Sequence, residues 1–414
     1  MYVVKPLRLA ACLALLTATW LVGLSGSVLA ETQPDPRAAR PLVVAGISAY
    51  ESGDYAKAID NLKRAQQADP SHSPTALYLG LAYLKQNDLS DAIVAWEKYI
   101  KLKPYTKVEQ QNDLQETVRR DLMILLRERD HQQALEQIAH ERELGPGSPE
   151  AVAISYYRNL GSPELTPLQK GLTALIIADV SEVPELKVVE RDRLQALIDE
   201  MKLGSSGLVD PKTAAHVGHL LGAGRVATGS YLDPTKGEMR INSVLAQTSS
   251  GQVLGDQQAA GKLVQFYNVE KALAAEILTG LGYDQNRLRA EGVLVAVQTP
   301  QTTSFPAFEA FSRGLDAKDR QDYPGARAAF QQALSFDPRF AAAQRELLHT
   351  PLAPLSVGQV SSSVSAAAPT VEVATAGMAG PQLFSGGVPI PFGGVPPPVC
   401  PVLVCPDCAI HVGR

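Results

Sequence analysis

The sequence is poor in cysteine, and its few cysteines lie close to its two ends. Only four occur in 414 residues: Cys12 near the start, and Cys400, Cys405 and Cys408 near the end. No disulfide can therefore join parts of the long segment between them. We expect that segment to be stabilised by the packing of its side chains instead.

The sequence also lacks a strong excess of either charge. Its 38 lysine and arginine residues nearly balance its 43 aspartate and glutamate residues, for a net charge of −5. Such a balance argues against nucleic-acid binding, which needs a basic surface. Beyond the first thirty residues no apolar run is long enough to span a bilayer, so we expect the mature protein to be soluble.

Residues 1–30 have the features of a secretory signal peptide. Lys5 and Arg8 supply a short basic start, residues 9–29 are almost wholly apolar, and the small residue Ala30 ends the run. This order is typical of a signal that is cleaved after export. The alternative is an uncleaved membrane anchor, because the apolar run is just long enough to span a bilayer.

A repeat with a period of 34 residues follows the signal. Pro70 and Pro104 are 34 residues apart (104 − 70), and each stands where a second helix must stop. Gly46 and Gly80 let paired helices approach closely, and Trp96 fills the space between neighbouring hairpins. The pattern resembles the tetratricopeptide (TPR) family over about 65 residues.

A charged helical stretch over residues 108–142 should cap this array, although a coiled-coil partner helix is the alternative. We therefore expect TPR hairpins plus capping helices over residues 39–145. The resemblance implies protein partners, held in a concave groove. We select four positions as exposed groove residues: Leu42, Tyr50, Tyr78 and Lys85.

The same pattern returns far along the chain. Residues 321–338, QDYPGARAAFQQALSFDP, echo residues 53–70, GDYAKAIDNLKRAQQADP. We predict a TPR-like hairpin within residues 301–349. A lone hairpin buries too little apolar surface to offset the entropy of ordering it. It must therefore dock on the central domain, on the first array or on another subunit, with Phe336 and Phe340 as the suggested contact residues.

The central segment, residues 149–284, changes from helical to mixed patterning. Alternating and helical periods predict the order β-α-β-α-α-β-β-β-α. This order indicates a small α/β sandwich with a mixed sheet.

Parts of the central segment resemble the CsgG-like, curli-secretion family over roughly residues 151–282. The resemblance rests on VVER at residues 188–191, SGLVD at 206–210, and LGA at 221–223 leading into TGS at 228–230. It implies a non-enzymatic role in secretion or surface assembly at the outer membrane of bacteria. The chain lacks two features of the family's secretion channel, a credible lipidated cysteine and long amphipathic hairpins, so the resemblance predicts the domain and the compartment rather than a pore.

Candidate chemical sites are few. His216 and His219, three residues apart, could share a metal ion, but no third ligand is evident. The charged cluster at residues 190–193 lacks a paired base or nucleophile, and GAGR at 222–225 leads into a strand, the reverse of a dinucleotide-binding loop. We therefore predict no catalytic residue, no cofactor and no metal, and hence no enzyme.

The tail, residues 350–414, is rich in Pro, Gly, Ser and Ala, and we predict it to be disordered. Its end, CPVLVCPDCAIHVGR, leaves three alternatives open. Cys400, Cys405 and Cys408 could form one disulfide with a free or intermolecular thiol, could bind zinc with His411, or could have no specific role.

Together these patterns predict an α+β multidomain protein: N-terminal TPR hairpins, a central α/β sandwich, a C-terminal TPR-like hairpin and a disordered tail. The predicted function is that of a non-catalytic scaffold or assembly factor of the bacterial cell envelope. Its predicted location is the periplasm or the periplasmic face of the outer membrane, with protein partners and a possible homo-oligomer. The alternative is a component of an outer-membrane secretion or curli-like export complex.

Overall fold

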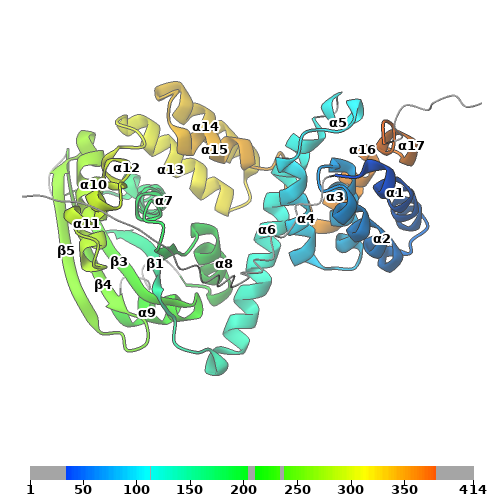
Figure 1. The fold of residues 1–414 in the computed structure, drawn as a ribbon. Helices are drawn as coiled ribbons and strands as arrows, with labels where there is room; N and C mark the ends of the chain where they lie inside the picture. Colours follow the sequence, from blue (N-terminus) through cyan, green and yellow to red (C-terminus); the bar gives the residue numbers. More distant parts are fainter. Residues whose placement is uncertain (1–33, 112, 204–209, 234–236, 379–414) are drawn as a thin grey trace, which may run out of the picture.

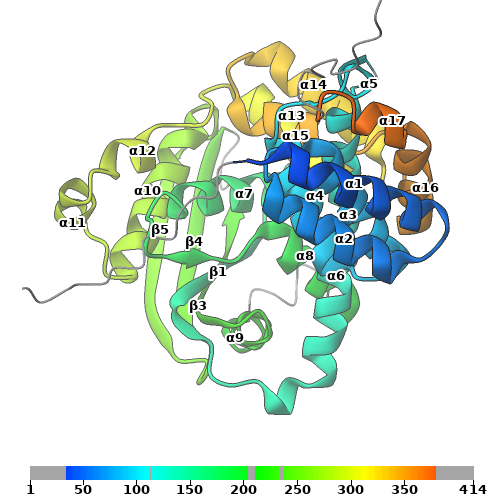
Figure 2. The ribbon, with the colours of Figure 1, turned by 45° about the vertical axis from the view of Figure 1, so that its right-hand side comes forward.

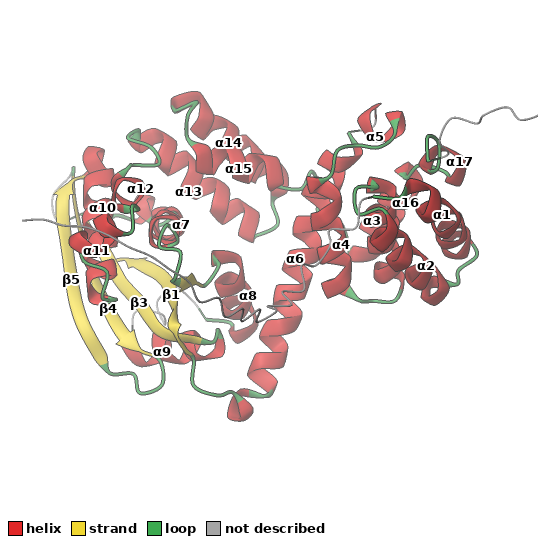
Figure 3. Cartoon of the chain, in the orientation of Figure 1, coloured by secondary structure: helices red, strands yellow, loops and turns green. Residues whose placement is uncertain are grey.

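The computed structural model describes residues 34–111, 113–203, 210–233 and 237–378. The predicted signal peptide and the three C-terminal cysteines lie outside these residues. The sheet lies at one side of the molecule, and the helices from both ends of the described chain lie together at the other side (Figures 1 and 3). Within the described residues, no helix is long and apolar enough to cross a membrane.

The N-terminal lobe, here called the helical array, consists of two helical hairpins, as predicted. Its helices are α1 (Pro36–Glu51), α2 (Tyr55–Ala68), α3 (Ser73–Lys85) and α4 (Leu89–Lys101). Asp54 and Asp88 cap the second helix of each hairpin, because their carboxylates accept the backbone N–H three residues on. A Cβ at Gly46 would lie 2.6 Å from Leu62 Cγ, and one at Gly80 would overlap the buried Trp96 ring. The close approach of paired helices therefore requires both glycines.

The helix that follows the array joins it to the rest of the molecule. After the short α5 (Lys107–Gln111), α6 (Leu114–Ala139) contacts α4 at one end. At its other end it contacts two helices of the central segment, α8 (Arg191–Met201) and α9 (Pro211–Leu220). Its buried residues recur three and four apart, as at Leu114, Val118, Leu122 and Leu125. The predicted capping helix thus packs against the helical array at one end and against the sheet domain at the other, and does not only shield the array from solvent.

The sheet domain follows the predicted order of elements. Its strands are β1 (Ser148–Asn159), β2 (Lys187–Val188), β3 (Ala223–Leu232), β4 (Glu238–Gln247) and β5 (Val253–Lys262), and its helices are α7 (Leu168–Val180), α8 (Arg191–Met201), α9 (Pro211–Leu220) and α10 (Phe266–Gly280). The strand order is β2-β1-β3-β4-β5, parallel around β1 and antiparallel from β3 to β5. The mixed sheet is therefore as predicted.

Alternation along β1 explains how both faces of the sheet are covered. Val152 and Ile154 point into the larger core, which includes α7 and α10. Ala151 and Ala153 point to the opposite face, into the core that α8, α9 and the end of α6 share.

Two short helices lead from the sheet domain to the next hairpin: α11 (Gln285–Ala290) and α12 (Leu294–Gln298). The third hairpin, α13 (Phe305–Asp319) and α14 (Tyr323–Phe336), with α15 (Ala341–His349), packs on the sheet domain. Phe308 stacks on Phe266 with ring centroids 4.2 Å apart. Phe340 is buried against Phe311, whereas Phe336 is half exposed. Of the three docking surfaces considered from the sequence, the structure shows the central domain.

The chain then returns to the helical array, which the sequence analysis did not predict. Residues 350–378 were assigned to the disordered tail, but they include α16 (Val357–Ala367) and α17 (Val371–Ala374). α16 lies against α3 and α6, and α17 lies against α1 (Figure 2). Val360 and Val364, four residues apart, are fully buried there. Although the segment has a low-complexity composition, the burial of this apolar helical face offsets the conformational entropy lost when the segment is ordered.

Candidate functional site

The inner face of the helical array, where TPR proteins are expected to hold a partner, is aromatic. We define it by Tyr50, His72, Tyr78 and Tyr105. The Tyr50 and Tyr78 rings meet edge to face with centroids 5.5 Å apart, and the His72 and Tyr105 rings do so at 4.5 Å. Such pairs combine a large apolar area with polar atoms that need partners when buried.

A buried carboxylate fixes Tyr105 in place. Glu109, on α5, accepts hydrogen bonds from Ser73 Oγ at 2.8 Å, from the backbone N–H of Tyr105 at 3.0 Å and from that of Thr106 at 2.8 Å. These bonds attach the loop after α4 to the start of α3. The two ends of the inner face are thereby held at a fixed separation.

The inner face is occupied by residues 356–378, which we call the C-terminal segment (Figure 2). Tyr50 Oη donates a hydrogen bond to Ser365 Oγ at 3.1 Å, and Tyr78 Oη donates one to the Pro369 carbonyl at 2.9 Å. His72 Nε2 donates to the Ala374 carbonyl at 2.8 Å. The hydroxyl groups of both Tyr50 and Tyr78 are thus hydrogen-bonded to the C-terminal segment.

Burial under the segment shifts the ionisation of these side chains. Burial raises the pKa of Tyr78 above its usual range, so the phenol stays neutral. Burial also lowers the pKa of His72, despite its bond to the Ala374 carbonyl and the nearby Asp69 and Glu109. A neutral imidazole can donate through Nε2 and accept from Thr75 Oγ1, 2.7 Å from Nδ1.

The four residues selected from the sequence have different surroundings. Tyr50 and Tyr78 lie on the inner face, but they are 8% and 4% exposed rather than open, because the C-terminal segment covers them. Leu42 is half-buried, and Lys85 is exposed at the end of α3. Sequence reasoning missed His72, although α3 carried a signal: it is apolar on all sides, which is typical of a helix covered on all sides.

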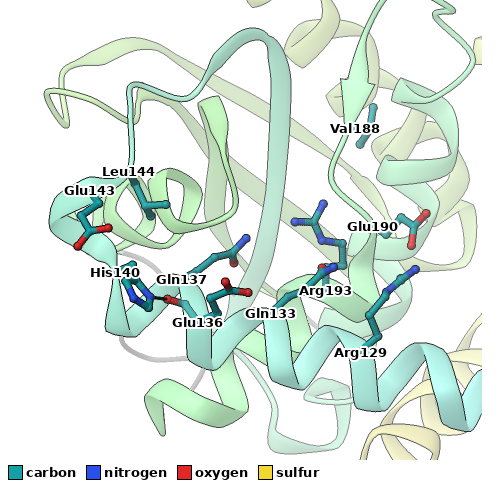
Figure 4. Close-up of a pocket in the computed structure, with 10 residues that line it drawn as sticks. All are labelled: Arg129, Gln133, Glu136, Gln137, His140, Glu143, Leu144, Val188, Glu190 and Arg193. Carbon is teal, nitrogen blue, oxygen red and sulfur yellow. Dashed lines mark hydrogen bonds between the residues drawn. The ribbon is translucent and has the colours of Figure 1, made fainter. Parts of the chain in front are cut away.

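An open cleft lies between α6 and the edge of the sheet domain (Figure 4). Its volume is about 1010 Å³, and its lining combines Arg129 and Arg193 with Glu136 and Glu190. Among the described residues that line the cleft, none is a serine, threonine or cysteine that could act as a nucleophile. Its mixed charges suit a solvated junction between lobes.

The charged cluster at residues 190–193 also includes Arg191 and Asp192, which have a structural role. Arg191 Nη1 lies 2.8 Å from Asp319 Oδ2, at the end of α13, and Lys318 Nζ lies 3.1 Å from Asp192 Oδ2. Burial alone would raise the pKa of Asp192, but Lys318 and Arg191 more than offset it and hold that pKa below its usual range. These pairs attach the third hairpin to α8.

Within the described residues, the structure brings no third ligand to the pair His216 and His219. His216 Nδ1 lies 3.2 Å from Glu141 Oε1, whereas Nδ1 of His219 is buried without a hydrogen-bond partner. No group of three or more His, Cys, Asp or Glu side chains is placed to hold a metal ion in the part of the chain that the structure describes. At residues 222–225, Gly222 has a φ of +72° and ends α9, and Gly224 packs against the Ser148 carbonyl, as expected for a helix end rather than a phosphate loop.

Comparisons with known families identify two segments. Residues 43–105 match the tetratricopeptide repeat family, and residues 148–233 match the family described as curli production assembly/transport component CsgG. Both resemblances inferred from the sequence are therefore confirmed. A comparison with curated proteins gives no significant match.

Among solved structures, two LpoB domains are similar to part of the chain. The LpoB C-terminal domain from Salmonella enterica is 15% identical, with a TM-score of 0.21, and covers 30% of this chain and 94% of that domain. The corresponding domain from Escherichia coli is 14% identical, with a TM-score of 0.24 and the same two coverages. TM-scores this low support no conclusion about function.

Proposed function

We propose that this protein is a non-catalytic scaffold that binds other proteins during assembly of the bacterial cell envelope. The TPR match supports a role in protein interaction, and the CsgG match supports a place in the envelope. The observation that carries the proposal is the inner face of the helical array, because it already holds a peptide segment of about twenty residues through defined contacts.

The two matched regions form a connected body, which suits a scaffold. α6 packs against the array and against α8, and the third hairpin is attached to α8 through Asp319 and Lys318. A partner on the inner face would therefore keep a fixed orientation relative to the sheet domain. The sheet domain is the part that we assign to docking at the periplasmic face of the outer membrane.

In-cell photo-crosslinking tests the scaffold function. A photoreactive amino acid at Lys85, exposed at the end of α3, should give discrete crosslinked bands with envelope proteins. The matched control is Val295, which is 75% exposed and belongs to α12, a helix that lies far from the array in Figure 1. Crosslinks absent at Lys85, or identical at the two positions, would argue against a partner on the array.

The second candidate function is a component of an outer-membrane secretion or curli-like export complex, which the CsgG match at residues 148–233 favours. Carbonate extraction of envelope fractions distinguishes the two. Retention in the outer membrane after extraction favours an export complex, whereas release with periplasmic proteins favours the scaffold.

A further inference from the structure

The C-terminal segment differs from the other elements of the core in how it is attached. It follows a six-residue connection, residues 350–355, in which Leu352 is 59% exposed. The start of this connection is fixed, because Arg327 Nη1 donates to the Thr350 carbonyl at 2.9 Å. Beyond that point the segment is held by the inner face and by α6.

The contacts at the inner face can be made by many peptides. Tyr78 and His72 bind the backbone carbonyls of Pro369 and Ala374, which every peptide has. The buried side chains of the segment are all uncharged: the apolar Val360, Val364, Pro369, Ala374 and Met378, and the hydroxyl-bearing Ser361 and Thr375. Charge is nearly absent, since Glu372 is the one charged residue between positions 354 and 378.

The segment should also be unstructured once it is released. α16 has eleven residues, and it is built largely from valine, serine and glycine, which are poor helix formers. Helices this short are marginal in water without tertiary contacts. Docking therefore has to offset the entropy of ordering the segment, which weakens its net affinity for the inner face.

The array, in contrast, needs a cover on this face. Every residue of α3 from Ser73 to Leu84 is buried when the segment is bound. Removal of the C-terminal segment would expose the Tyr50 and Tyr78 rings together with apolar parts of α3. An occupant that leaves must therefore be replaced by another of similar chemistry.

We propose that residues 356–378 are a resident ligand of the array, exchanged for a partner segment of the same chemistry. This proposal rests on the proposed scaffold function and specifies its ligand. The partner segment is an uncharged helix with valine or alanine four residues apart, followed by a proline and a second short apolar turn. The free protein thus carries its own competitor.

Peptide binding to the purified full-length protein tests the proposal. The probe is a fluorescent peptide of residues 354–378, measured by anisotropy. Val360→Glu with Val364→Glu places two carboxylates in buried sites and should release the resident segment. In the wild type, the probe peptide must displace the resident segment before it can bind to the inner face. The variant lacks this competition, so it should bind the peptide at least about 10-fold more tightly than wild type.

The matched control is Ser362→Glu with Ala366→Glu, which adds the same charge on the exposed face of α16. It should bind the peptide as weakly as wild type does. A peptide that carries Glu at positions 360 and 364 should not bind the released variant. Equal binding by the released variant and the wild type, or no binding by either, would overturn the proposal.

A second experiment avoids substitutions at buried positions. A protease site replaces the exposed residues 352–354, and cleavage leaves the segment bound without a covalent link. Excess probe peptide should then displace the fragment while the helical circular dichroism of the body persists. The proposal is wrong if displacement unfolds the array, since the segment would then be part of the core, or if the uncleaved protein is a dimer that exchanges segments between copies.

Neither result depends on an external partner. A negative peptide result with positive crosslinks at Lys85 would therefore reject the resident ligand while supporting the scaffold function. The reverse outcome would support an exchangeable segment in a protein whose partner lies elsewhere.

Discussion

Asp319 is the side chain whose loss should most weaken the attachment of the third hairpin to the sheet domain. Its side chain is 6% exposed, and it accepts hydrogen bonds from Lys170 Nζ at 2.6 Å and from Arg191 Nη1 at 2.8 Å. Asp319→Asn keeps the shape but removes the charge, so two buried cations lose a partner. Removing one partner of a buried pair typically costs about 3–5 kcal/mol. Because Lys170 keeps Asp316 at 3.4 Å and Arg191 keeps Asp192, we expect about 2–4 kcal/mol here.

The measurement is the free energy of unfolding in urea, followed by circular dichroism. Glu309→Gln is the matched control, because Glu309 lies on the same helix and pairs with Arg313 on an exposed face at 2.5 Å. Its loss should cost less than about 0.5 kcal/mol. Hydrogen exchange in α13 should also become faster in Asp319→Asn. If the two variants lose the same stability, the buried pairs do not hold the hairpin and the reasoning fails.

Three further substitutions and one control, Gly358→Ala, test the packing and the buried carboxyl groups. Gly80→Ala should cost about 1–3 kcal/mol in thermal denaturation, because the new methyl group overlaps the Trp96 ring, whereas Gly358→Ala, on an open helical position, should be neutral or stabilising. Burial raises the pKa of Asp121 to about 6, so the folded state favours the protonated acid and loses stability as the pH rises through 6. Asp121→Asn should remove that loss and be more stable by about 2–3 kcal/mol at pH 8, and an unchanged pH profile of urea unfolding would contradict this. Burial and the neighbouring Asp179 raise the pKa of Glu270 well above its usual range, so Glu270→Gln should change the melting temperature little at pH 7, and a large drop would show that the carboxylate is ionised.

The array was predictable because its pattern is local. The proline period, the two glycines and Trp96 all act within one or two hairpins, and the structure places each as expected. The docking of the third hairpin followed from an energetic argument, since a lone hairpin cannot bury enough apolar surface. The surface that receives it, including Phe266, could not be read from the sequence, because no local period connects it to Phe308.

Contacts between distant parts of the chain were not predictable. Arg191 and Asp319 are 128 positions apart, and nothing in either segment marks the other as its partner. The C-terminal segment was missed for a different reason. Its composition resembles a disordered tail, and two valines four residues apart are a weak helical signal.

Only part of the candidate site could therefore be predicted from the sequence. Tyr50 and Tyr78, selected from the sequence as groove residues, lie on the first helices of the two hairpins, and their binding of a partner stays a prediction. Their exposure was predicted wrongly, because a single sequence does not show that its own end will cover them. His72 was overlooked, since its contribution depends on the distant Ala374 carbonyl.

The described chain starts and finishes on the same lobe, with α17 against α1 (Figure 2). A mechanical load applied through the two ends would thus act on the seam between these helices and would bypass the sheet. In a single-molecule pulling experiment, the first event should be a low-force extension of about 75–85 Å, the contour length of residues 356–378 at about 3.3–3.6 Å per residue. The sheet domain should yield only later and at higher force, so that tension in the surrounding structure could uncover the array without unfolding the body.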